Sequence, residues 1–320
     1  MIKEKLETAV KDGNLLASTE QNINEFLSLD PCPEWVSLGL EELINSNNWE
    51  ELNDRFHRNL AFGTGGMRGR TIGKIITSTE RGTSKDGATP AFACVGSNTL
   101  NEFTLLRATK ALYNYLNKWM QQRGILEQPR LVVAYDVRHF SPKFSEIVSK
   151  AWVKMGGYAM VFDGPRSTPQ LSFTVRHRYA HAGVVITASH NPFHDNGFKA
   201  YFGDGAQLVP PHDHGVVEEY NRINLSEVSH WLQEDGLTGV EVAVLPTQDD
   251  MAYKGALEDA VLNPDLLKTN APKIVFTPIH GTGAISSVPA LWDHGVQVAL
   301  VDEQSKEDAN FSTVKSPNPE

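Results

Sequence analysis

The sequence lacks any apolar run approaching the roughly 20 residues of a membrane-spanning helix, and its first residues contain no apolar stretch of signal-peptide length. It is poor in cysteine: Cys32 and Cys94 fit no metal or redox spacing, so we expect two idle thiols. It also lacks an excess of basic charge, since 29 Lys and Arg stand against 39 Asp and Glu, a formal net charge of −10. A protein that binds nucleic-acid backbones normally presents a basic face. We therefore expect a cytoplasmic protein that binds neither nucleic acid nor membrane.

What the sequence does contain is an alternation of strand and helix patterns. Residues 1–60 are polar and helical in pattern, but from residue 104 onward short buried strands such as "RLVVAYD" and "HAGVVIT" alternate with helices such as "KFSEIVSKAWVKMGG". A second strand–helix–strand pattern begins near residue 272. This order predicts an α/β fold with mostly parallel sheets. With 320 residues we expect two domains, residues 1–240 and 241–320.

Ser189, in "TASHNP", directly follows the predicted strand "AGVVIT". In open α/β sheets ligands bind beyond the carboxyl ends of strands, so this position makes Ser189 a candidate site residue. Ser, Asn and Pro are also turn residues, and a plain turn is the alternative. A serine-hydrolase elbow would need glycine two residues before and two after the serine, where the sequence has Thr187 and Asn191. That class of hydrolase is therefore excluded.

Histidine spacing gives little support for a zinc site. His190 and His194 are four residues apart, but Pro192 lies between them and prevents a regular helical face. His177 and His181 have helical spacing but lack a third ligand of clear spacing.

The segment "FKAYF" alternates apolar residues with Lys199 and Tyr201, as in a strand with one face on the core. Asn196 and Gly197 just before it predict a tight turn that would bring Lys199 back toward Ser189. An ordinary surface lysine is the alternative for Lys199.

The stretch "FGTGGMRG" has four glycines in eight residues, which predicts a loop without a regular strand or helix. Glycines allow backbone N–H groups to approach an anion closely, and an arginine fork suits phosphate. We expect Thr64, Gly65 and Arg68 of this loop to contact phosphate, together with Arg138, which follows the strand in "YDVRHFSP". The loop matches neither the P-loop nor the dinucleotide-binding fingerprint.

Taken in order, these motifs resemble one family. "TASHNP" followed by "DNGFK" closely resembles the phosphoserine signature of the α-D-phosphohexomutase superfamily, and "FGTGGMRG", "YDVRHFSP", "GDGAQLVPPHD", "IHGTG" and "SPNPE" resemble other family segments in the same order. The helical lead-in with "NNWEELNDRF" is most similar to the phosphoglucomutase and phosphopentomutase branch. The resemblance runs from about residue 35 to 320. It implies repeated three-layer α/β domains with mixed, mostly parallel sheets, of which this chain would hold the first and most of the second.

The resemblance also implies a chemistry. In similar enzymes a phosphorylated serine, bound to Mg²⁺, gives its phosphoryl group to a sugar phosphate and takes one back from the resulting bisphosphate. Ser189 would be that serine, and Lys199 the general acid and base, its pKa lowered by neighbouring cations such as Arg68. His190 and Asn191 match residues that hydrogen-bond around the phosphoserine. A sugar 1,6-bisphosphate would act as activator, and a sugar phosphate would be the partner molecule.

One family element is missing. The metal loop D-x-D-x-D-R supplies oxygen ligands to Mg²⁺, and neither Asp249-Asp250 nor Asp302-Glu303 has its spacing. In the family this loop comes shortly after "PNPE", where the chain stops. We therefore expect an N-terminal fragment, inactive alone, with Ser189 as metal ligand through its phosphate only. The aspartates, the sugar-selecting loop and the C-terminal phosphate-binding domain would lie beyond the chain end. The choice among glucose, mannose and pentose phosphates stays open, as does a non-catalytic sugar-phosphate-binding protein.

Overall fold

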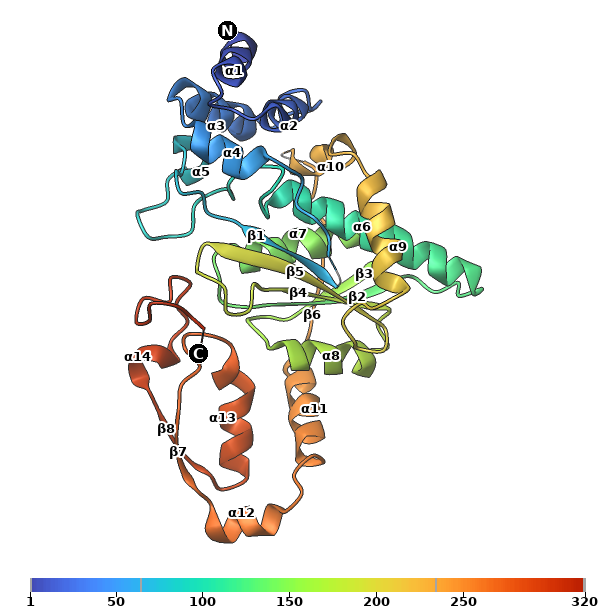
Figure 1. The fold of residues 1–320 in the computed structure, drawn as a ribbon. Helices are drawn as coiled ribbons and strands as arrows, with labels where there is room; N and C mark the ends of the chain where they lie inside the picture. Colours follow the sequence, from blue (N-terminus) through green and yellow to red (C-terminus); the bar gives the residue numbers. More distant parts are fainter. Residues whose placement is uncertain (1, 64, 234, 319–320) are drawn as a thin grey trace.

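In the computed structural model, residues 2–63, 65–233 and 235–318 are described (Figure 1). They form a helical N-terminal unit, a central sheet flanked by helices, and a smaller C-terminal unit below the sheet in the view of Figure 1. None of the helices in these ranges is long and apolar enough to cross a membrane.

The N-terminal unit consists of α1 (Ile2–Lys11), α2 (Ala17–Leu27), α3 (Glu34–Asn45) and α4 (Trp49–Phe56), as the helical pattern predicted. Its apolar side chains, among them the fully buried Phe26, form one core together with Val95, Phe103 and Leu225 of the segments that follow. The Phe26 ring lies edge-on to Phe56, at a centroid distance of 5.5 Å, and to Phe103 of the central domain at 5.3 Å. The unit is therefore packed against the domain that follows it.

Within the described residues, six strands form the central sheet in the order β1-β5-β4-β2-β3-β6. The strands are β1 (Gly66–Arg70), β2 (Arg130–Tyr135), β3 (Tyr158–Val161), β4 (Ala182–Ile186), β5 (Asp195–Phe202) and β6 (Ala243–Val244). β2, β3, β4 and β6 run parallel, whereas β5 is antiparallel to both β4 and β1. The mixed, mostly parallel α/β sheet confirms the predicted fold class.

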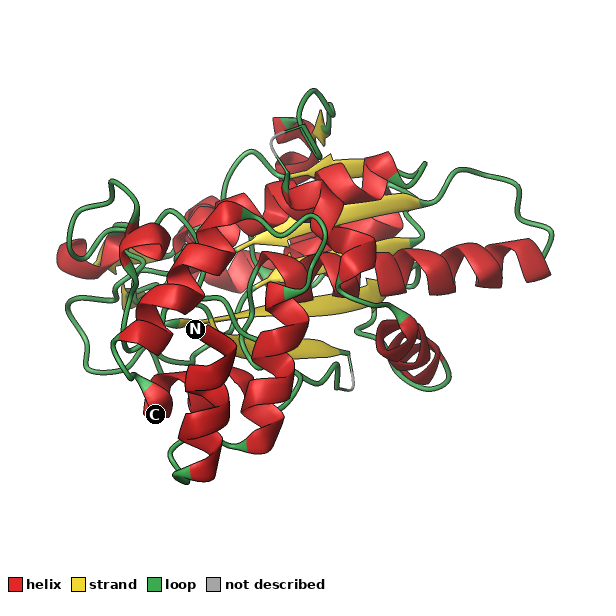
Figure 2. Cartoon of the chain, turned by 90° about the horizontal axis from the view of Figure 1, so that it is seen from above, coloured by secondary structure: helices red, strands yellow, loops and turns green. Residues whose placement is uncertain are grey.

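Helices cover both faces of the sheet. α6 (Glu102–Gln122), α7 (Ser141–Lys154) and α9 (His212–Arg222) lie over one face, as the view from above in Figure 2 shows, and α8 (Thr168–His177) lies under the other. Alternate residues of β2 serve the two cores: Val133 packs with the α6 and α7 side, Val132 with the α8 side. α6 begins where the Asn101 side chain accepts hydrogen bonds from two backbone N–H groups, and it ends just before Gly124, at φ 68°.

Two local predictions near the site were wrong. The glycine loop was expected to hold no regular structure, yet its second half forms β1, where Gly66 pairs with Lys199 of β5. A side chain at Gly66 would lie 2.2 Å from the Phe198 carbonyl oxygen, so the glycine serves a close approach of two strands. Asn196 and Gly197 do not form a turn either, because both belong to β5 and pair with β1, where Gly197 lies opposite Arg68. The chain reverses earlier, between residues 189 and 194.

The C-terminal unit repeats the strand–helix–strand pattern that the sequence predicted. It comprises α11 (Thr247–Glu258), α12 (Pro264–Asn270), β7 (Lys273–Phe276), α13 (Gly283–Asp293), β8 (Gln297–Leu300) and α14 (Asp302–Ser305), and β7 and β8 pair in parallel. α13 packs against β8, but Val275 on β7 is 77% exposed. β6 pairs with β3 and so extends the central sheet to residue 244; the domain boundary near residue 240 stays a prediction.

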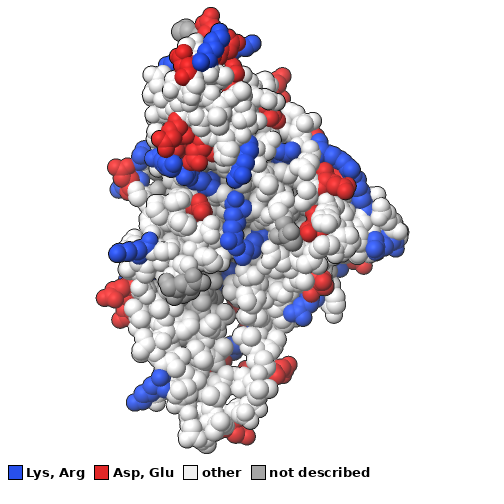
Figure 3. All heavy atoms as spheres, in the orientation of Figure 1, with Lys and Arg blue, Asp and Glu red and all other residues white. Residues whose placement is uncertain are grey.

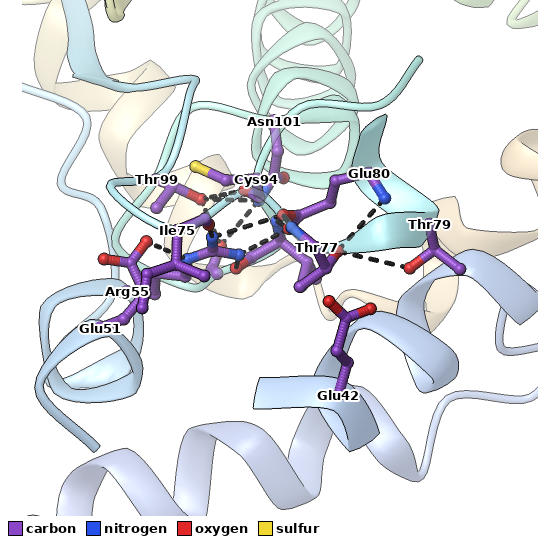
Figure 4. A network of polar contacts seen from close by, with 12 residues as sticks. Glu42, Glu51, Arg55, Ile75, Thr77, Thr79, Glu80, Cys94, Thr99 and Asn101 are labelled. Carbon is purple, nitrogen blue, oxygen red and sulfur yellow. Dashed lines mark hydrogen bonds and ion pairs between the residues drawn. The ribbon is translucent and has the colours of Figure 1, made fainter. Parts of the chain in front are cut away.

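A buried ionic cluster fixes the segment between β1 and α6, which contains the short helix α5 (Ser78–Arg81) (Figure 4). The Arg55 guanidinium of α4 donates to Glu51 Oε1 at 2.8 Å, to Glu80 Oε1 at 2.5 Å and to the Ile75 carbonyl oxygen at 2.5 Å. Burial lowers the pKa of Arg55, but Glu80 and Glu51 outweigh that effect and leave the pKa raised. Beside it, burial raises the pKa of the free Cys94 thiol to about 12, which leaves that thiol unreactive near neutral pH.

Candidate active site

Ser189 lies at the carboxyl end of β4 in a left-handed backbone conformation, with φ 59°. Its N–H donates to Thr187 Oγ1 at 2.9 Å, and its side chain is exposed. A residue other than glycine in this conformation is uncommon and is often found at functional sites. The local geometry therefore presents the Ser189 hydroxyl to solvent on a constrained turn.

The buried side chain of Arg138 fixes the backbone of this turn by hydrogen bonds. Its side chain is 1% exposed, and its guanidinium donates to four backbone carbonyl oxygens of one loop. Nη2 donates to the carbonyls of Ser189 at 2.8 Å and Asn191 at 2.6 Å, and Nη1 to those of Pro192 at 2.8 Å and Asp195 at 3.1 Å. These contacts commit both Nη atoms of Arg138 to the loop. The expected contact of Arg138 with phosphate stays a prediction.

Asp136 holds Arg138 in turn, and its place at the end of β2 went unnoticed in the sequence. Its Oδ1 accepts the backbone N–H of Arg138 at 3.0 Å and the Ser141 hydroxyl at 2.7 Å, and its Oδ2 lies 3.3 Å from Arg138 Nε. Burial raises the pKa of Asp136, an effect that Arg138 opposes. Asn196 was also missed as a site residue. Its buried amide donates to the His139 carbonyl oxygen and to Ser141 Oγ, and so ties β5 to the segment that follows β2 and contains Arg138.

Lys199 is half-buried on β5, between Gly66 of β1 and Val185 of β4. As predicted, the neighbouring Phe198 and Ala200 face the α6 and α7 core while Lys199 faces the other side of the sheet. Burial lowers the pKa of Lys199, and the positive charge of Arg68 lowers it further. A lysine with a lowered pKa is more often neutral, and only the neutral amine can accept a proton.

Arg68 is exposed on β1, opposite Gly197 of β5. Its charge acts on both Lys199 and Arg138, so the three cations share one electrostatic neighbourhood. Figure 3 shows basic side chains gathered over β1 and β5 on an otherwise mixed surface. A local concentration of positive charge suits an anionic ligand despite the negative net charge of the chain.

The remaining predicted residues lie on the two loops. His190 is exposed, and the Asn191 amide donates to Asp195 Oδ2 at 3.0 Å. Gly65 has φ 74°, and its carbonyl oxygen accepts hydrogen bonds from the N–H of Ala200 and the amide of Gln207. Thr64 lies outside the described residues.

A cavity of about 400 Å³ opens beside Ser189, between the central domain and the C-terminal unit. From the central domain it is lined by Asp136, Val137, Thr168, Thr187, Ser189 and His190, and from the C-terminal unit by residues 277–279, Gly281, Thr282, Phe311 and Pro317. Its volume is in the range of small-molecule sites. Among the described residues, Arg68 and Lys199 do not line it; they lie farther along β1 and β5.

The described part of the chain contains no group of three or more His, Cys, Asp or Glu side chains that could hold a metal ion. Asp136 lines the cavity, but its oxygens already accept from Arg138 and Ser141. Asp249 and Asp250 pair with Arg178 and Arg166 at the junction of α8 and α11. These residues do not by themselves form a Mg²⁺ site, so a metal bound here would need ligands from elsewhere.

Comparison with known proteins identifies the class. The family "Phosphoglucomutase/phosphomannomutase, alpha/beta/alpha domain I" matches residues 93–227, and its domain II counterpart matches residues 253–320. The chain therefore belongs to the phosphoglucomutase/phosphomannomutase family, which confirms the superfamily that the motifs resemble.

The individual relatives differ in substrate. A phosphoglucomutase of Staphylococcus haemolyticus is 32% identical over 83% of this chain and 43% of its own length. A phosphopentomutase of Mus musculus is 29% identical over 98% of this chain and 48% of its own. The solved structure of a putative phosphomannomutase from Thermus thermophilus has the same fold, with a TM-score of 0.58 at 22% identity over 82% of this chain and 49% of that one. The chain thus spans about half the length of the relatives it matches.

Proposed function

We propose that this chain carries the phosphoserine half of a phosphosugar mutase site, with Ser189 as the residue that holds the phosphoryl group. The observation that carries the proposal is the exposed Ser189 on a left-handed turn, pinned by a buried arginine at the mouth of a 400 Å³ cavity. Family membership supplies the reaction class. The proposed reaction moves a phosphoryl group between the 1 and 6 positions of a hexose phosphate, or between the corresponding positions of a pentose phosphate.

In the proposed step, a sugar hydroxyl oxygen bonds to the phosphorus on Ser189 while the bond from phosphorus to Ser189 Oγ breaks. The hydroxyl proton passes through neutral Lys199 to the released serine oxygen, so atoms and charge balance. The bisphosphate then turns over and returns its other phosphoryl group to Ser189 by the reverse step. Phosphoryl transfer depends mainly on position and charge neutralisation, which Arg68 and the loop residues Thr64, Gly65, His190 and Asn191 would supply.

The lowered pKa of Lys199 supports its role in this scheme, because the shift arises from burial and from the positive charge of Arg68, which we also propose as a site residue. We also propose that the complete site uses Mg²⁺ and is primed by a sugar 1,6-bisphosphate. The residues described here do not form the metal site, and no step above depends on it.

The test is a mutase assay of the native protein, purified from the cells that produce it, on glucose, mannose and pentose phosphates. Ser189→Ala should lower turnover by several orders of magnitude on whichever substrate is used, because it removes the hydroxyl oxygen that we propose carries the phosphoryl group. Ser28→Ala, an exposed serine on the C-cap of α2, is the matched control and should leave turnover unchanged. Binding of sugar phosphate without turnover in the unaltered protein would instead identify a non-catalytic binding protein.

A further inference from the structure

Arg138 touches both parts of the molecule. The Nη atoms of its guanidinium donate to four carbonyl oxygens of the Ser189 loop. The Phe311 ring of the C-terminal unit lies against the same guanidinium, with 5.1 Å between the ring centroid and Arg138 Cζ. Phe311 is 6% exposed. An arginine held between hydrogen-bond acceptors and an aromatic ring is shielded from water, which strengthens both kinds of contact.

The turn that carries Phe311 is itself constrained. Asp308 accepts the N–H groups of Asn310 and Ser312, each at 2.9 Å, and Phe311 has a left-handed backbone with φ 50°. As at Ser189, this conformation in a residue other than glycine indicates that the surroundings fix it.

Asn310 fastens the same turn to the central domain. Its Oδ1 lies 3.0 Å from Nε2 of His139, the residue after Arg138, and its Nδ2 donates to the Gly87 carbonyl oxygen at 2.9 Å. The second ring nitrogen of His139 lies 2.8 Å from Thr89 Oγ1. Asn310 and Phe311 of this turn therefore contact His139 and Arg138, which follow β2.

We infer that the turn 308–313 positions the Ser189 loop through Arg138, and that Phe311 and Arg138 are positioning residues of the phosphoryl-carrying site. The path is continuous: Phe311 covers Arg138, and Arg138 holds the carbonyls of Ser189, Asn191 and Pro192. The relevance of this path to phosphoryl transfer rests on the proposed function, but the mechanical coupling does not. Placement of the C-terminal unit thereby determines how rigidly the serine is presented.

The direct test is hydrogen exchange of peptides covering residues 187–196 in the 320-residue chain without ligand. Phe311→Ala should speed exchange in this loop by about threefold to tenfold, because Arg138 loses its shield. Phe311→Tyr keeps the ring and should exchange like the unaltered chain. Val275→Ala, an exposed position on β7 of the same unit, is the matched control and should leave the loop unchanged. Unchanged loop exchange in Phe311→Ala, with faster exchange confined to residues 308–314, would overturn the inference.

A kinetic readout separates positioning from mere folding. In the protein as its own cell makes it, Phe311→Ala should lower kcat by about tenfold with a smaller change in KM, since a misplaced serine slows transfer more than binding. Phe311→Tyr should restore kcat, and equal losses in both variants would contradict the proposed role of the ring. If the unaltered protein shows no turnover, the proposed function fails, while the exchange experiment still decides the coupling.

Discussion

At the scale of the residue, the position of Ser189 after a strand and that of Lys199 on a strand were predictable, because each stands in a distinctive local sequence. Ser189 follows a buried apolar run, and Lys199 alternates with apolar residues. The actual partners of Arg138 were not predictable, because its contacts are to backbone carbonyls more than 50 positions along the chain. A charged residue after a strand gives the same sequence signal whether it binds a ligand or a loop.

Lys199→Met should slow turnover by about 10²–10⁴-fold, the usual effect of losing a general acid or base. Met keeps the length and apolar stem of the side chain, so sugar-phosphate binding should be largely retained. Steady-state kinetics on the protein as its own cell makes it would check the result. An unchanged kcat would remove Lys199 from the proton-transfer role.

The same substitution should raise stability at neutral pH. The pKa of Lys199 is lowered in the folded state, so between that pKa and the ordinary value of 10.5 the unfolded chain binds more protons and stability rises with pH. Below this window the protonated amine disfavours the folded state, and Met removes that penalty. Thermal melts should show a higher Tm for Lys199→Met at pH 7, with a gain that shrinks as the pH approaches 10.5. A lower Tm at pH 7 would contradict the burial-driven shift.

At the scale of the element, the parallel strands and their helices followed from alternation along the chain, but β1 did not. Its sequence, GMRGR, has neither β-branched nor aromatic residues, so no local propensity predicts a strand. Pairing with β5 forms it, and only the tertiary structure supplies that partner. For the same reason the Asn196-Gly197 signal failed: β1 and Thr187 hold both residues in an extended strand.

Gly197→Ala tests this reading of β1 and β5. A methyl group there would lie 2.3 Å from the Thr187 carbonyl oxygen, so the strands or the Ser189 loop must shift. We expect a loss of about 1–3 kcal/mol in the free energy of unfolding, as for other overpacked sites, measured by urea denaturation.

Gly255→Ala is the control for that measurement. Gly255 lies within α11 with open space around it, so alanine should be neutral or stabilising by up to about 1 kcal/mol. Equal effects of the two substitutions would show that Gly197 of β5 does not lie as close to the Thr187 carbonyl oxygen as described.

At the scale of the whole molecule, the Arg55 cluster joins the N-terminal helices to the segment that leads into α6. Arg55→Ala should lower the free energy of unfolding by about 3–5 kcal/mol, because Glu51 and Glu80 would remain buried without their partner. Arg222→Ala, which removes an exposed arginine, should change it by no more than about 0.5 kcal/mol. Urea denaturation of the two variants side by side would decide; similar losses would show that the cluster does not stabilise the assembly of the two units.

Metal binding is also a property of the whole molecule. Since the described residues contain no cluster of three metal-ligating side chains, the 320-residue chain should bind Mg²⁺ only weakly by isothermal titration and show no measurable mutase activity alone. Tight Mg²⁺ binding would reveal a ligand set among carboxylates assigned here to ion pairs.

The measurement that tests the central claim most directly is the mass of the protein purified as its own cell makes it, followed by mapping of the peptide that contains residues 183–199. We predict one phosphoryl group, located on Ser189 and lost on incubation with excess sugar monophosphate. Ser189→Ala should lack it. A protein that never carries phosphate at Ser189, even after incubation with a sugar 1,6-bisphosphate and Mg²⁺, would contradict the account.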